Sequence, residues 1–320
     1  MKNLRKKSPP KPKLIVVLGP TASGKSALAV KLAKKFKGEI ISADSRQVYK
    51  ELDIGSGKVT KKEMGGIPHH LLDVASPKRT FTAAQYGRRA EKEIRNILSR
   101  GRLPIICGGT GFYIDTLLND AGLPEVPPNP RLRKRLEKLT ADELYRKLIT
   151  LDSRRARTID RKNKRRLIRA LEIIEATGQA VPAVGGQKGN YDVLKIGIRL
   201  PEEELKEKIK KRLKRRLDLG LVAEVKRLRN EGVSDKRLED LGLEYRYVSR
   251  YLRGLISHEE MVSRLEAEIR HYAKRQMTWF KKDKKIKWIS DHKKTEAEIF
   301  LFIKNEKGGG GPSADQRASP

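Results

Sequence analysis

The sequence predicts an α/β protein whose core is a parallel sheet, with a mostly helical domain inserted into it. Two observations support this prediction. Apolar runs of strand length at residues 13–20, 38–45 and 102–113 are separated by segments with helical spacing, and residues 123–190 become basic and helical after a proline-rich hinge. Continuous apolar strands joined by helices are typical of a parallel sheet covered on both faces, with its site at the carboxyl ends of the strands.

The first strand runs into a glycine-containing turn and then a helix. The turn fits the pattern G-x-x-x-x-G-K-[ST] at Gly19, Pro20, Thr21, Ala22, Ser23, Gly24, Lys25 and Ser26. In such a loop the backbone N–H groups of residues 21–26 surround an anion, the lysine adds a positive charge, and the final hydroxyl side chain holds Mg²⁺. The core is therefore predicted to be P-loop NTPase-like and to bind a phosphorylated ligand, with Ser26 as the metal ligand.

The second and third strands also end in polar or glycine-rich stretches. Asp44, at the end of the second strand, could be a Mg²⁺ ligand, a general base facing a substrate, or a surface carboxylate. The third strand ends in GGTGFY, which includes Thr110 and could be a simple turn or a backbone that approaches a ligand closely. Both stretches are expected at the same edge of the sheet as the phosphate loop.

The chain is predicted to be organised in five parts. These are a disordered basic arm at residues 1–12, the first part of the core at 13–122, the helical insertion at 123–190, the completion of the core with C-terminal helices at 191–304, and a disordered tail at 305–320. In the completion of the core, strands are expected at residues 192–200 and 285–290 and long helices at 203–231 and 259–282.

Composition points to a polyanionic partner. Lysine and arginine number 73 against 40 acidic residues, a net charge of +33 spread along the whole chain. The single cysteine, Cys107, excludes an internal disulfide and is expected to be a buried thiol. No run approaches the roughly 20 apolar residues of a membrane helix and the N-terminus lacks a signal sequence, so we expect a cytoplasmic protein without a membrane partner.

Eight stretches, in order from about residue 14 to 290, resemble one family, the tRNA dimethylallyltransferases or isopentenyl-diphosphate:tRNA transferases. They are GPTASGKS, DSRQVYKELDIGSGK, IPHHLLD, GGTGFYIDTLL, RRLIRALEI, GLVAEV, GLEYR and AKRQMTWF. The resemblance implies transfer of a five-carbon prenyl group from dimethylallyl diphosphate to N6 of adenosine 37 in tRNA. It is closer to the bacterial form, since no C-terminal zinc finger is present.

The resemblance assigns roles to the motifs. Asp44 would be the base that takes a proton from the amine, Thr21 and Arg212 would hold the departing diphosphate with the phosphate loop, and Ser26 would bind Mg²⁺. It implies that Asp44, Ser45, Arg46, Gln47 and Thr110 lie near the target nucleotide. It further implies that the anticodon stem-loop is contacted by Arg165, Arg166, Leu167, Ile168, Arg169, Gly242, Tyr245, Arg246, Lys274, Arg275 and Gln276.

Two segments depart from the family pattern. Gly55–Val59 reads G-S-G-K-V instead of G-T-A-K-P, which predicts a more flexible loop with the charge of Lys58 available. In the insertion the usual H-P-N-D-P-Q-R becomes DRKNKRR, so that Arg165 replaces a contact glutamine. Both departures bear on tRNA selection more than on chemistry, and a monomer is the default expectation.

Two other functions compete with this interpretation. An ATP-dependent kinase of a nucleotide or small molecule would use the same loop, but it leaves the ordered downstream motifs and the charge of +33 unexplained. A non-catalytic RNA-binding module would explain the charge. Retention of Lys25, Ser26 and Asp44 argues against it.

The stretch HYAKRQMTWFKKDKK mixes cations with Trp279 and Phe280. It fits either a surface that binds a nucleic acid backbone and stacks its bases, or an amphipathic helix with its aromatic residues in the core.

Overall fold

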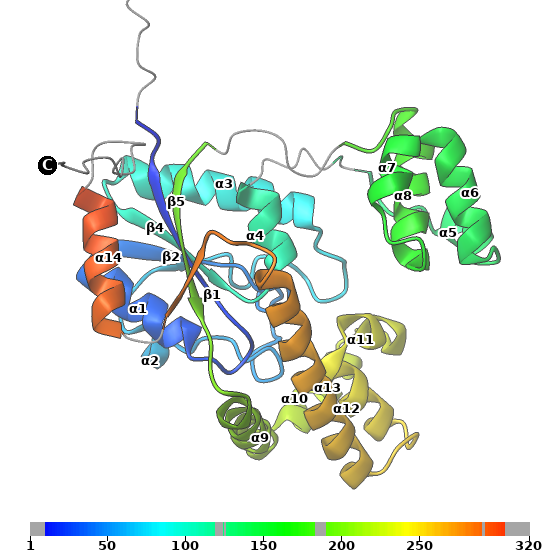
Figure 1. The fold of residues 1–320 in the computed structure, drawn as a ribbon. Coiled ribbons are helices and arrows are strands. Elements are labelled where there is room, and N and C mark those ends of the chain that lie inside the picture. The colour runs from blue at the N-terminus through cyan, green and yellow to red at the C-terminus, as the bar shows by residue number, and fades with distance from the viewer. Residues whose placement is uncertain (1–9, 119–123, 125, 183–189, 290–291, 305–320) are drawn as a thin grey trace, which may run out of the picture. The chain divides into compact units, whose positions relative to one another are not determined.

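The computed structural model in Figure 1 describes residues 10–118, 124, 126–182, 190–289 and 292–304. The chain divides into two compact units. The sheet unit comprises Met1–Phe81, Arg89–Ile114 and Asn190–Pro320, and the helical unit comprises Thr82–Arg88 and Asp115–Gly189. The predicted tail, at residues 305–320, and most of the predicted arm, at residues 1–9, lie outside the described residues.

Six parallel strands form one sheet in the order β3-β2-β4-β1-β5-β6. They are β1 (Lys13–Leu18), β2 (Gly38–Ser42), β3 (His69–His70), β4 (Leu103–Gly108), β5 (Asp192–Ile198) and β6 (Ile286–Ile289). The predicted α/β class and its parallel sheet are confirmed. His70 of β3 makes a structural contact: its Nε2 lies 2.7 Å from a carboxylate oxygen of Glu39, a buried residue of β2.

The apolar runs form strands because both faces of the sheet are covered. Ile15 and Val17 of β1 join a buried cluster with residues of α1 (Lys25–Lys35) and with Ile299 of α14 (His292–Lys304), and both helices flank the strands in Figure 1. The alternating residues Leu14 and Val16 point to the opposite face and are also fully buried. A sheet buried on both sides needs apolar residues at every position, which is the pattern that the sequence shows.

The remaining helices of the described residues belong to the sheet unit, to the helical unit or, for α3 and α4, partly to each. They are α2 (Lys61–Met64), α3 (Ala83–Ser99), α4 (Gly111–Leu118), α5 (Pro130–Leu136), α6 (Ala141–Leu151), α7 (Ser153–Thr158), α8 (Lys164–Thr177), α9 (Glu202–Asp218), α10 (Leu221–Asn230), α11 (Asp235–Leu241), α12 (Leu243–Leu252) and α13 (His258–Phe280). Among the helices of the described residues, none has the length and apolarity needed to cross a membrane.

One helix predicted from the sequence is two separate helices in the structure. The expected helix over residues 203–231 ends at Asp218 and restarts at Leu221, because Gly220 adopts a left-handed backbone with φ of 96°. The other long helix, α13, is confirmed. Ser257 caps its first turn by accepting a hydrogen bond from the backbone N–H of Glu260, and the Glu260 side chain returns a bond to the Ser257 N–H.

The helical unit has its own core and one buried carboxylate. Leu144 and Leu148 of α6 pack with Leu167 of α8 in this core. Glu172 of α8 is 1% exposed, and its carboxylate accepts hydrogen bonds from Arg133 (2.9 and 2.8 Å), from Arg169 (2.6 Å) and from the backbone N–H of Asn129 (2.6 Å). Burial raises the pKa of Glu172, but these donors outweigh burial and leave its pKa lowered.

Replacing Glu172 with glutamine should therefore destabilise the chain by about 2 kcal/mol at pH 7, since hydrogen bonds to charged groups are lost. A carboxyl group whose pKa is lowered on folding contributes stability above its unfolded pKa and loses it as the pH falls. The difference in urea unfolding between wild type and Glu172→Gln should thus shrink at pH 3. Glu175→Gln, which removes an exposed ion pair with Arg135, is the matched control and should cost far less. Equal effects at pH 7 would contradict this account.

Candidate active site

Three neighbouring strands bring the predicted site segments to one edge of the sheet. β4 lies between β1 and β2, with Leu18 paired to Gly108 and Ser42 paired to Cys107 at the strand ends. The phosphate loop follows β1, the Thr110 segment follows β4 and Asp44 follows β2. All three therefore meet at the carboxyl edge, as the sequence predicted.

The phosphate loop is built around the start of α1. Gly24 precedes this helix with φ of 89°, and the first helical N–H groups have no partner within the helix, which favours an anion there. The Nζ of Lys25 donates to the carbonyl of Pro20 at 3.2 Å and so lies across the loop. Burial lowers the pKa of Lys25, and nearby Asp44 opposes this change. The hydroxyl of Ser23 is buried and has no hydrogen-bond partner among the described residues.

The prediction that the backbone N–H groups of residues 21–26 all surround an anion is wrong at two positions. The N–H of Thr21 donates to the side-chain oxygen of Gln276 at 2.8 Å, and the N–H of Ser23 donates to the carbonyl of Pro20 at 3.3 Å. Both donors are therefore already used inside the protein. The anion site is left with the N–H groups at the start of the helix, the charge of Lys25 and the Ser23 hydroxyl.

Arg212 reaches the phosphate loop from α9. Its guanidinium donates to the hydroxyl of Thr21, so the structure brings together the two residues that the family resemblance paired. Burial, followed by the charge of Arg216, lowers the pKa of Arg212 to about 10. Arg212 is still a cation at neutral pH, and it adds a second positive charge beside the loop.

Asp44 is held in place by the backbone of its own turn. Its Oδ1 accepts hydrogen bonds from the N–H groups of Arg46 at 2.8 Å and Gln47 at 3.3 Å. The next residue, Ser45, donates its N–H to the hydroxyl of Thr110 at 3.0 Å, which joins the turn to the loop after β4. Among the described residues no hydrogen bond to Asp44 Oδ2 is present, so this oxygen is available to a substrate.

The side chain of Gln47 is engaged inside the protein. Its Nε2 donates to the carbonyl of Gly57 at 3.0 Å, and the hydroxyl of Ser42 donates to its Oε1 at 3.4 Å. Gly57 has φ of 60°, and a side chain there would meet the guanidinium of Arg216, with its Cβ 1.9 Å from Nη2. Only glycine fits this position, and Arg216 is itself fixed by a buried ion pair with Glu244 at 2.6 Å.

The prediction that the Gly55–Val59 loop is flexible, with the charge of Lys58 available, is wrong. Lys58 forms ion pairs with Asp53 and Asp73, both at 2.5 Å, so its charge is not available to a ligand. The buried carboxylate of Glu224 accepts three hydrogen bonds from the backbone of residues 53–55, at 3.0, 2.7 and 3.0 Å. A side chain distant in sequence thus supplies the restraint that a proline would have supplied locally.

Several predicted RNA contacts lie in the protein interior. Tyr245 is 1% exposed and donates its hydroxyl to Glu224 at 3.1 Å, so its side chain cannot reach an RNA. Gln276 is 6% exposed and bonded to two loops. In the helical unit, Leu167 and Ile168 belong to the apolar core. These side chains support the fold, and their assignment as direct contacts is corrected.

Other predicted RNA contacts are accessible. Lys274 and Arg275 on α13 are exposed, as are Arg165 and Arg166 on α8, while Arg169 is half-buried and paired with Glu172. Gly242, the residue between α11 and α12, is buried and is not among the accessible positions. Arg246 donates through its guanidinium to the carbonyl of Glu239, at 3.2 and 3.1 Å.

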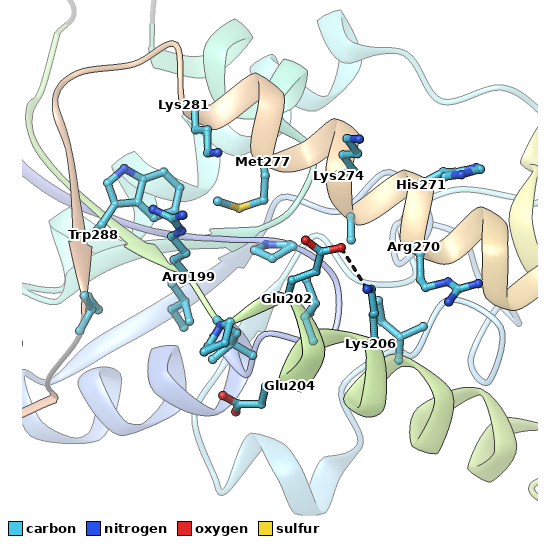
Figure 2. Close-up of a pocket in the computed structure, with 18 of the residues that line it drawn as sticks. Arg199, Glu202, Glu204, Lys206, Arg270, His271, Lys274, Met277, Lys281 and Trp288 are labelled. Carbon is cyan, nitrogen blue, oxygen red and sulfur yellow. Dashed lines mark ion pairs between the residues drawn. The ribbon is translucent and has the colours of Figure 1, made fainter.

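A cavity of about 1130 Å³ opens beside Pro20 of the phosphate loop (Figure 2). The end of β5, the start of α9, α13 and β6 form its walls. Apolar atoms come from Ile198, Met277 and Trp288, and cations such as Arg199 and Lys281 stand on its rim. Sequence reasoning missed this cavity because its lining comes from segments far apart in the chain, which only the fold brings together.

The fold and the site define a P-loop α/β protein whose phosphate loop lies next to a fixed carboxylate. Residues 47–283 match the model of the family described as IPP transferase. The chain belongs to this family.

Relatives and solved structures agree with this assignment. The chain is 41% identical over 298 residues to a tRNA dimethylallyltransferase of Anoxybacillus flavithermus, covering 92% of this chain and 94% of that protein. It is similar to the crystal structure of a tRNA isopentenylpyrophosphate transferase from Bacillus halodurans, with a TM-score of 0.69, 36% identity, and 92% and 97% of the two chains covered. A eukaryotic dimethylallyltransferase acting on tRNA gives a TM-score of 0.76 at 26% identity, with 92% and 80% covered.

Proposed function

We propose that the protein transfers a dimethylallyl group from dimethylallyl diphosphate to N6 of adenosine 37 in tRNA, giving N6-(dimethylallyl)adenosine and diphosphate. The observation that carries this proposal is the placement of an anion site and an anchored carboxylate at one edge of the sheet. The names of the curated relatives support it. So does the resemblance to a eukaryotic enzyme that acts on tRNA.

The phosphate loop would hold the leaving group. When the bond between the allylic carbon and the diphosphate oxygen breaks, negative charge grows on that oxygen. The charges of Lys25 and Arg212 and the N–H groups at the start of α1 would stabilise this charge where it develops. Because these groups are fixed before the reaction, little reorganisation would be needed in the transition state.

Asp44 would act on the acceptor amine. The lone pair of an exocyclic amine is delocalised into the base, so the amine is a weak nucleophile. As N6 forms its bond to the allylic carbon, Oδ2 of Asp44 would take a proton from N6 while Oδ1 stays bonded to the turn. The product is a neutral secondary amine, and the proton leaves on the carboxylate.

We propose Mg²⁺ as the cofactor. No group of three or more His, Cys, Asp or Glu side chains within the described residues could hold a metal. The hydroxyl of Ser26 in the first turn of α1 fits the role of a single protein ligand, since Mg²⁺ is commonly held by few protein groups together with substrate phosphates. When bound, the ion would supply further positive charge to the diphosphate.

The exposed cations would bind the anticodon stem-loop through its phosphates. Lys274 and Arg275 on the sheet unit and Arg165 and Arg166 on the helical unit are available for this, within a chain of net charge +33. The target base must leave its stack to reach Asp44, which is easier in a single-stranded loop. We propose that the enzyme works as a monomer in the cytoplasm, where its tRNA substrate is found.

The test combines purified protein, Mg²⁺, radiolabelled dimethylallyl diphosphate and an anticodon stem-loop RNA with an A36-A37-A38 run. Label should enter the RNA, and replacing the target adenine with guanine should abolish it. ATP in place of the donor is the control for a kinase. Phosphate release from ATP without label in the RNA would overturn the proposal.

A further inference from the structure

We propose that Gln276 is a positioning residue that fixes the phosphate loop relative to the segment carrying the base Asp44. This inference rests on the proposed function, because it assigns to Gln276 the alignment of the loop that would hold the diphosphate with the carboxylate that would take the proton. The family resemblance placed Gln276 among the tRNA contacts instead.

The amide of Gln276 joins two loops that follow different strands. Its Oε1 accepts a hydrogen bond from the N–H of Thr21 at 2.8 Å, and its Nε2 donates to the carbonyl of Gly109 at 2.9 Å. Thr21 lies in the loop after β1 and Gly109 in the loop after β4. One side chain of α13 thus ties together the backbones of two neighbouring loops at the carboxyl edge of the sheet.

The hydrogen-bonded connection continues from Gly109 to the segment that carries Asp44, the proposed general base. Thr110 donates its N–H to the carbonyl of Ala43 at 3.1 Å and accepts a hydrogen bond from the N–H of Ser45 at 3.0 Å, on either side of Asp44. Tyr272 lies one turn before Gln276 on α13 and adjoins Thr110: burial raises the pKa of Tyr272 to about 12, and the Thr110 side chain opposes this change. The same face of α13 therefore holds both the phosphate loop and the segment that carries Asp44.

The amide of Gln276 is closely packed. A Cβ atom on Gly109 would lie 2.2 Å from Nε2 of Gln276, so the glycine is what allows the amide to approach. The neighbouring side chain Ala273 is 2% exposed and Phe280 is 3% exposed, so this face of α13 is buried. An amide that is 6% exposed, with one partner for its donor and one for its acceptor, is suited to positioning rather than to RNA contact.

The expected consequence is a loss of rate that does not come from a loss of RNA binding. A misplacement of about 1 Å between reacting groups costs on the order of 100-fold in rate. Without its amide, Gln276 would let the phosphate loop and the Asp44 segment shift relative to each other. RNA phosphates, by contrast, are held by exposed cations such as Lys274 and Arg275, which this change leaves in place.

The experiment compares Gln276→Met, a near-isostere without hydrogen bonds, with Arg264→Gln, a control on the same helix that removes an exposed ion pair to Glu260. For Gln276→Met we expect the single-turnover rate at saturating donor and RNA to fall on the order of 100-fold. We also expect weaker binding of inorganic diphosphate with Mg²⁺, measured by calorimetry. The dissociation constant for the stem-loop RNA should stay within about twofold. Arg264→Gln should match wild type in all three measurements.

A second variant covers the case in which Gln276→Met does not fold. Gly109→Ala keeps the glutamine but pushes its amide away, so it should lower the rate and the diphosphate affinity in the same way. If the two changes act on one connection, the double variant should be less impaired than the product of the single effects.

Either of two results overturns the proposal. One is an RNA dissociation constant raised about tenfold with an unchanged single-turnover rate, which would make Gln276 an RNA contact. The other is an unchanged rate and unchanged diphosphate binding in Gln276→Met and Gly109→Ala. If wild type transferred no label to RNA, the proposed function would fail, and the diphosphate-binding comparison would still decide whether Gln276 fixes the phosphate loop.

Discussion

Replacing Asp44 with asparagine should lower the single-turnover rate of prenyl transfer roughly 10²- to 10⁴-fold, the range typical of a lost general base. Asparagine keeps a side-chain oxygen that can accept the hydrogen bonds from the N–H groups of Arg46 and Gln47, so the turn should keep its shape. It cannot take a proton from the amine. The affinities for donor and RNA should change little, because the lost interaction is made mainly in the transition state.

The rate is measured by rapid quench with labelled donor and saturating RNA. Asp218→Asn is the matched control, since it removes the same charge from an exposed position at the end of α9. A rate in Asp44→Asn equal to that of wild type would show that another group takes the proton. A large loss in Asp218→Asn would show that net charge rather than a base is responsible.

Replacing Lys25 with methionine should lower the rate roughly 10²- to 10³-fold, by analogy with the removal of one group that stabilises developing negative charge. Donor binding should weaken as well, while RNA binding should not, since Lys25 lies across the phosphate loop. Lys31→Met on the same helix is the control, because the Lys31 side chain is exposed and pairs with Glu296 instead of facing the loop.

The lowered pKa of Lys25 gives this prediction a second measurement. Lys25 is a cation only below its pKa, and burial lowers that pKa from its ordinary value. Donor affinity in wild type should therefore decline with rising pH earlier than an ordinary lysine would allow. The decline should be missing from Lys25→Met. The same decline in wild type and Lys25→Met would mean that another group titrates.

The strands and the phosphate loop could be predicted because the residues that determine each of them are close together in the sequence. A continuous apolar run such as residues 13–18 forms a strand buried on both faces, and the loop motif specifies its own turn. The two-residue strand at His69–His70 carries too little pattern to be recognised. The break at Gly220 was missed because a single glycine inside a long helical pattern is also tolerated.

The roles of buried polar residues could not be predicted from local pattern. Lys58 pairs with Asp73 fifteen residues away, and Glu224 holds a loop about 170 residues before it. Only the folded chain brings such groups together. For the same reason the family resemblance marked stretches around Tyr245 and Gln276 without indicating that these side chains point inward.

The most direct test of the central claim is to identify the product on the RNA. After reaction of wild-type enzyme with dimethylallyl diphosphate and the stem-loop RNA, the RNA is digested to nucleosides and analysed by mass spectrometry, with released diphosphate counted in parallel. We predict N6-(dimethylallyl)adenosine from position 37, with one diphosphate released per modified nucleoside, and neither product from Asp44→Asn. An unmodified RNA together with turnover of ATP, or a prenyl group on another atom, would contradict the account.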